Sequence, residues 1–201
     1  MMSGSPTTGP QPRSDVPSPF PLDTELWRFA LSFYGREGVA PACLALQERL
    51  AVDVNVLLFG IFALLKQGIA LEAEDLDAVG ALVHDWQAEI VKGLRHIRTR
   101  LKSGPSPAAC AATEELRNSV KSVEIAAERI ELAMLAGWLE RRPLRQGPAD
   151  ADPGTVLALI ARHFASGATA RLGDPAVRQA LRTLTHAAGE AASEEQSPAR
   201  S

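Results

Sequence analysis

One continuous apolar stretch, residues 54–65, constrains the fold more than any other part of the chain. It reads Val-Asn-Val-Leu-Leu-Phe-Gly-Ile-Phe-Ala-Leu-Leu. A helix of this composition has no polar face, so other helices must surround it. It is also shorter than the roughly 20 apolar residues that cross a bilayer. The stretch therefore predicts the central helix of a protein core, with Asp53 as its N-cap, Gly68 at its C-terminal end and one polar interior residue, Asn55.

The flanking segments have the periodicity of helices. Their apolar residues recur every three or four positions, and the alternating pattern of strands is absent. The expected helices cover about residues 23–34, 41–50, 53–68, 72–102, 107–141, 154–166 and 175–188. The sequence thus predicts an all-α, compact helical bundle in which the first, second, fourth and fifth helices fully bury the third.

The two longest of these helices are separated only by a short Gly/Pro-rich break at residues 103–107. A connection of this kind predicts a long antiparallel helical hairpin. With the turn centred on this break, Arg95 is expected to face residues 114–115, and Trp86 is expected to face Val123.

Composition divides the chain into a helical part and flanking segments. Residues 1–21 are rich in Ser, Pro, Thr and Gly and are expected to form a disordered tail, as are residues 189–201. A bundle domain is expected over residues 22–142, followed by a linker over residues 143–153. Two short helices follow within residues 154–188, and the sequence leaves open whether they dock on the bundle.

Charge and cysteine spacing limit the classes of function. The chain has 21 basic and 24 acidic residues and a net charge of −3, so nucleic-acid binding is not expected. The N-terminus lacks the apolar run of a secretory signal, and the spacing of Cys43 and Cys110 fits neither CxxC nor a zinc site. We expect a cytoplasmic protein without membrane insertion, in which Cys43 is a buried, unreactive thiol. The oligomeric state is open.

The motifs of metal, nucleotide and nucleophilic chemistry are absent from the sequence. No histidine has a Glu three positions before it, as di-iron bundles require, and no HExxH occurs. There is no GxGxxG, GxxxxGK[ST] or GxSxG. The sequence therefore predicts no metal and no cofactor, and it identifies no catalytic residue. An enzyme is a remaining hypothesis, with Asp53, Glu124 and Glu128 as acid–base candidates.

A polar group at the junction of the second and third helices is a candidate site. Asp53, Asn55 and Gln47 lie within nine positions of one another in a largely apolar region. In one interpretation they are structural: the Asp caps a helix, and the amides bond neighbouring backbone, since an unpaired buried amide costs about 1–3 kcal/mol. In the other they are polar anchors at the bottom of a ligand pocket.

Aromatic and basic residues form two further candidate groups. Trp27, Tyr34 and Trp86 either pack in the core or form the floor of an aromatic pocket. The basic cluster at the end of the fourth helix includes Arg95 and Arg98 on one face. The helix dipole and pairing with acidic residues explain this cluster better than phosphate binding does.

Several short motifs between residues 22 and 139 occur in the order found in a known family. They are Trp27-x-Phe29, Cys43-Leu44-x-Leu46-Gln47, Asp53-Val54-Asn55-x-Leu57-Leu58-Phe59, Leu94-Arg95 with Arg98, and Glu124 with Glu128-Arg129. In these motifs the chain resembles the proteobacterial domain-of-unknown-function family numbered 2390. The resemblance implies a small, cytosolic, all-helical protein, and it carries over no catalytic residue.

Two hypotheses for function follow, besides the enzyme. The first is a non-catalytic adaptor or accessory protein that binds another protein through a helical surface. The alternative is a helical module that holds a small apolar ligand. The candidate ligand-binding residues are Trp27, Gln47, Asp53, Asn55, Trp86, Arg95 and Glu128.

Overall fold

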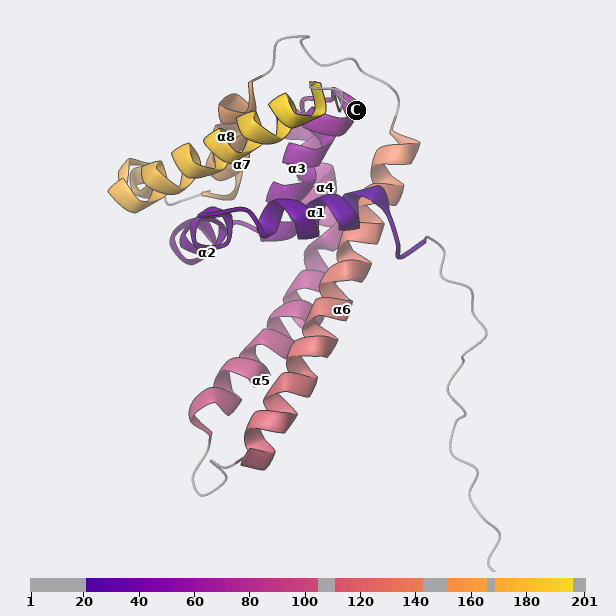
Figure 1. Ribbon diagram of the computed structural model, residues 1–201, viewed down its shortest axis with the longest axis vertical. Coiled ribbons are helices and arrows are strands. Elements are labelled where there is room, and N and C mark those ends of the chain that lie inside the picture. Colours follow the sequence, from indigo (N-terminus) through magenta and orange to yellow (C-terminus); the bar gives the residue numbers. More distant parts are fainter. Residues whose placement is uncertain (1–20, 105–110, 143–151, 166–168, 197–201) are drawn as a thin grey trace, which may run out of the picture.

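The computed structural model describes residues 21–104, 111–142, 152–165 and 169–196, and every regular element within these ranges is a helix (Figure 1). The predicted all-α fold class is confirmed. The elements are α1 (Glu25–Tyr34), α2 (Val39–Leu50), α3 (Val54–Gln67), α4 (Ala73–Asp85), a π-helical segment (Trp86–Val91), α5 (Lys92–Ser103), α6 (Ala111–Arg141), α7 (Pro153–Phe164), a 3₁₀ segment (Thr169–Gly173) and α8 (Pro175–Gln196).

Helix α3 lies at the centre of the core, as its composition predicts. Every residue from Asn55 to Ala63 is buried. The side chain of Asp53 accepts a hydrogen bond from the backbone N–H of Asn55 at 2.9 Å, and Gly68 ends the helix in the left-handed conformation that glycine tolerates best. Both predicted ends of α3 are therefore confirmed.

The set of helices around α3 differs from the prediction. Helices α1, α2, α6, α7 and α8 pack on it. The predicted fourth helix begins with α4, but α4 makes no extensive contact with α3. Helix α7 packs on α3 in its place. The close approach of α7 depends on Gly60, because a Cβ built there would overlap Cδ1 of Ile160. A glycine within an apolar run thus marks the contact site of another helix.

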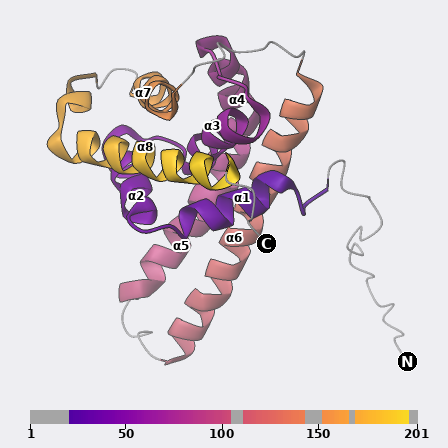
Figure 2. The same cartoon turned by 45° about the horizontal axis from the view of Figure 1, so that its top comes forward.

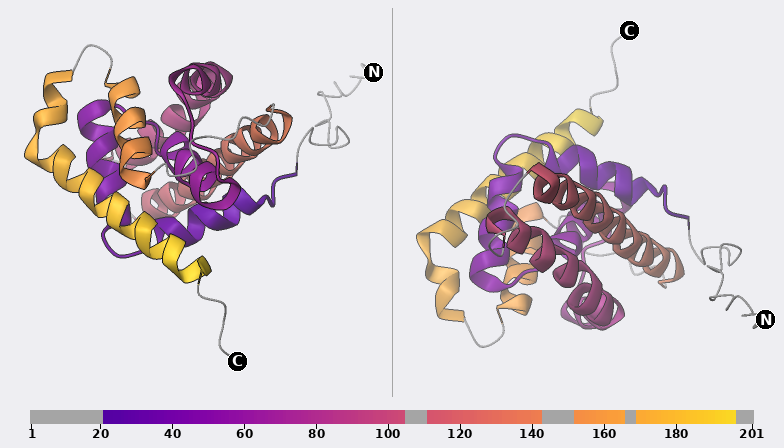
Figure 3. Two further views of the ribbon diagram at one scale, coloured as in Figure 1. Left: turned by 90° about the horizontal axis from the view of Figure 1, so that it is seen from above. Right: turned by 90° about the horizontal axis from the view of Figure 1, so that it is seen from below.

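The C-terminal helices share the core of the N-terminal ones. Leu157, Ile160 and Leu184 are fully buried and join the cluster that contains α1, α2 and α3. Seen from above, α7 and α8 lie on the opposite side of α3 from α6 (Figure 3). In the ranges described here, no helix combines the length and the apolar composition needed to cross a membrane.

The ends of α7 and α8 differ from the sequence prediction. Helix α8 continues to Gln196 through part of the segment that was expected to be a tail, and Ala191 on this extension is buried. Asp152, expected in the linker, is the N-cap of α7 and accepts the N–H of Gly154 at 2.7 Å. The remainder of the predicted linker and tails, residues 1–20, 143–151 and 197–201, lies outside the described residues.

Helices α5 and α6 form the predicted antiparallel hairpin, which projects from the rest of the molecule (Figures 1 and 2). Its predicted register is wrong. Arg95 contacts Glu124 and Glu128 instead of residues 114–115, and Trp86 contacts Ala127 instead of Val123. One cause of the shift is the π-helical segment, which changes the phase of the helix that precedes the hairpin turn.

Candidate ligand pocket

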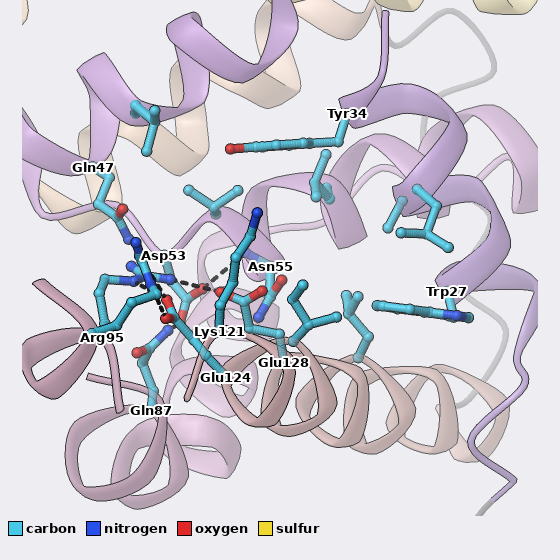
Figure 4. A pocket seen from close by; sticks show the side chains of 18 residues that line it. Trp27, Tyr34, Gln47, Asp53, Asn55, Gln87, Arg95, Lys121, Glu124 and Glu128 are labelled. Carbon is cyan, nitrogen blue, oxygen red and sulfur yellow. Dashed lines mark hydrogen bonds and ion pairs between the residues drawn. The ribbon is translucent and has the colours of Figure 1, made fainter. Parts of the chain in front are cut away.

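A pocket of about 390 Å³ is lined by residues of α1, α2, α3, α5 and α6 (Figure 4). Its volume falls within the range of roughly 300–1,000 Å³ that is typical of small-molecule sites. Six of the seven candidate residues from the sequence line it: Trp27, Gln47, Asp53, Asn55, Arg95 and Glu128.

The pocket has two chemically different ends. Figure 4 shows Gln47, Asp53, Gln87 and Arg95 at one end and Trp27 at the other. Seven of the other lining residues are apolar: Ala30, Leu31, Leu44, Val54, Leu58, Ile125 and Leu132. Such a cavity suits a molecule with one polar group on an apolar body.

Asp53 organises the polar end. Its Oδ1 accepts the N–H of Asn55, and its Oδ2 accepts a hydrogen bond from Nε2 of Gln87 at 2.8 Å. Gln87 is a buried residue of the π-helical segment, and an extra residue in a helical turn redirects the side chains that follow it. Asp53 thus has the structural role of a helix cap and also lines the pocket.

Four charged residues of the hairpin form one wall of the pocket. Nε of Arg95 donates to Glu124 at 2.9 Å, and a terminal nitrogen of Arg95 donates to Glu128 at 2.7 Å. Arg98 donates to both carboxylate oxygens of Glu124. Burial acts to raise the pKa of Glu124, but the hydrogen bonds from Arg98 and Arg95 lower it overall. Burial raises the pKa of Glu128.

The three acid–base candidates of the enzyme hypothesis all line this pocket. A shared pocket is the minimum requirement for acid–base catalysis by these three residues. However, the two arginines that bind Glu124 hold it as a carboxylate in an ion-pair network. Within the described residues, no three His, Cys, Asp or Glu side chains are placed to hold a metal ion.

Sequence reasoning missed Glu131, the most deeply buried acidic residue. Its exposed fraction is 0%, and its carboxyl group interacts with the side chains of Asp53 and Asn55. Burial and the negative charge of Asp53 raise the pKa of Glu131 to about 9. The missed signal was a spacing of four and three residues in Glu124, Glu128 and Glu131, which puts these three acids on one face of α6.

Trp86, the seventh candidate residue, is not among the residues that line this pocket. Its indole Nε1 donates to the carbonyl of Ala127 at 3.0 Å and joins the π-helical segment to α6. Tyr34 does line the pocket. Trp27 contributes to the pocket wall, and the guanidinium of Arg129 lies 5.4 Å from its ring centroid, within the range of cation–π contact.

The predicted burial of Cys43 is confirmed, because its side chain is fully buried. Burial raises the pKa of its thiol to about 12. A thiol with so high a pKa is a poor nucleophile at neutral pH. Cys110 lies outside the described residues.

The part of the chain that forms this pocket matches the model of a known protein family. The family model described as "Protein of unknown function (DUF2390)" matches residues 25–135, which is more than half of the chain. Searches of curated proteins and of solved structures gave no match. The matched region runs from the start of α1 into α6 and contains every residue that lines the pocket. The chain therefore belongs to the DUF2390 family.

Proposed function

We propose that this protein is a non-catalytic binding protein that holds a small amphipathic molecule in the pocket between α1, α2, α3, α5 and α6. One observation carries the proposal: polar and aromatic residues from separate helices line a single cavity of about 390 Å³. The polar end would orient the ligand, and the apolar wall would provide most of the affinity.

Exposed apolar side chains on the pocket lining support this function. Leu31, Leu44 and Ile125 line the pocket, and their exposed fractions are 55%, 47% and 41%. They come from three different helices. Covering apolar surface stabilises a complex by roughly 25 cal/mol per Å² before the costs of association are subtracted. A bound molecule would remove these side chains from water.

Titration with the uncharged fluorescent probe N-phenyl-1-naphthylamine tests the proposal. We expect saturable 1:1 binding to the wild type. The double variant Leu44→Trp/Ile125→Trp should weaken it at least ten-fold, because the larger side chains fill the pocket. The matched control is Leu116→Trp/Val123→Trp, which replaces exposed apolar residues that do not line the pocket. Equal binding to the two variants would contradict the proposal.

Binding to another protein, the first hypothesis from the sequence, is a second candidate function. The observation that favours it is the exposure of Ile97 on α5 and of Leu116 and Val123 on α6, each about half exposed. Leu116 and Val123 are seven positions apart and share one face of α6, and contiguous exposed apolar surface is typical of interaction sites. The two functions involve different residues, so they can be tested separately.

A further inference from the structure

We propose that the ligand of this pocket is an organic cation, an ammonium or guanidinium group on an apolar body, and that Asp53 pairs with its charge. This inference rests on the proposed binding function and specifies the chemistry of the ligand.

Among the carboxylates that line the pocket, only Asp53 forms no ion pair with a basic side chain in the described part of the chain. Glu124 and Glu128 form ion pairs with arginine side chains. Asp53 is only 7% exposed, and Asn55 and Gln87 donate hydrogen bonds to it from uncharged amide N–H groups. In the described part of the chain, no Lys, Arg or His forms an ion pair with it. A buried carboxylate without a cation is energetically costly, so a cationic ligand would supply the missing partner.

An unused hydrogen-bond acceptor lies at the same end. Gln87 lines the pocket, and its Oε1 is buried without a partner among the described residues. A ligand that satisfies this end must donate hydrogen bonds. An ammonium group offers three donors and a guanidinium group five, whereas a carboxylate offers none.

The cations that line the pocket do not favour an anionic ligand. Arg95 and Arg98 already donate to glutamates of α6, so an anion would have to compete with those carboxylates. Lys121 is exposed and remains hydrated, so its charge is largely screened by water and salt. The aromatic end, with Trp27 and Tyr34, is suited to the apolar body of the ligand.

Calorimetric titration at pH 7 with three molecules of the same chain length tests the inference: octylammonium, 1-octanol and octanoate. We expect the wild type to bind octylammonium at least ten-fold more tightly than octanol, and octanoate more weakly than octanol. Asp53→Asn should abolish the preference and bind octylammonium and octanol equally. Asparagine is also a good N-cap, so this variant should keep α3 intact. The matched control is Asp85→Asn, at an exposed position outside the pocket.

Each other outcome has a defined meaning. If octanol or octanoate binds as tightly as octylammonium, the pocket holds amphiphiles but does not select cations, and only this inference is overturned. If the preference for octylammonium persists in Asp53→Asn, Asp53 is not the group that recognises the charge. If none of the three molecules and no N-phenyl-1-naphthylamine binds, the proposed function fails as well.

Discussion

When the pH is raised from 5 to 8, the free energy of unfolding of the wild-type protein is expected to fall. This fall should be about 2–4 kcal/mol larger than the change for Glu131→Gln. In the folded state, burial and then the charge of Asp53 raise the pKa of Glu131 from the ordinary 4.5 to about 9. Between these values the folded protein keeps the proton of Glu131, whereas the unfolded chain has lost it. Stability from this group is therefore fully present below the unfolded pKa and is lost as the pH rises, by up to about 1.4 kcal/mol per pH unit.

Urea denaturation at a series of pH values between 5 and 8 measures this effect. Glutamine cannot ionise, so the difference between the wild type and Glu131→Gln isolates the titration of this one side chain. The difference in the free energy of unfolding should therefore change in favour of the variant as the pH rises from 5 to 8. Glu115→Gln, which changes an exposed acid on the same helix, should follow the wild type. If the free energy of unfolding depends on pH in the same way for the wild type and Glu131→Gln, Glu131 does not hold its proton in the folded state.

Gly60→Ala is expected to lower the free energy of unfolding by about 1–2 kcal/mol, against the general preference of helices for alanine. The added methyl group would overlap Cδ1 of Ile160, which is fully buried on α7. Gly80→Ala is the matched control, because a Cβ at this helical glycine meets no atom within 4 Å. This control should raise stability by about 0.5–1 kcal/mol. Thermal and chemical denaturation should therefore show a lower stability than the wild type for Gly60→Ala and a higher stability for Gly80→Ala.

The double variant Gly60→Ala/Ile160→Val tests whether the contact with α7 is the cause. Ile160→Val removes the methyl group that overlaps, and by itself it should cost about 0.5–1.5 kcal/mol. If α7 packs on α3 as the structure shows, the double variant should be more stable than the sum of the two single changes predicts. Strict additivity would mean that Ile160 does not limit the space at Gly60.

The central features of the fold could be predicted because their sequence signals are local. The composition of residues 54–65 alone requires a buried helix, and Asp53 and Gly68 have the residue types of helix ends. The apolar stripe of α1, namely Leu26, Phe29, Ala30 and Phe33, is buried as the spacing indicates. Which helix packs on α3 was not predictable, since it depends on the fit between Gly60 and Ile160, which are 100 residues apart.

The candidate site was predicted where polar residues interrupt an apolar pattern. Asp53 and Asn55 stand at the start of the most apolar segment, and both line the pocket. Glu131 was missed because, in a long helix with many charged residues, an acid on the inward face resembles one on the surface. Trp86 was misplaced because the π-helical segment changes the phase of its helix. A helical periodicity of 3.6 residues cannot anticipate such a segment.

Native mass spectrometry of the protein, purified without detergent from cells that produce it, tests the central claim most directly. If the pocket holds a small molecule, the wild type should carry an added mass that is lost under denaturing conditions and is absent from Leu44→Trp/Ile125→Trp. A bare mass for the wild type, together with protein partners recovered equally by the wild type and this variant, would contradict the account and favour an interaction module.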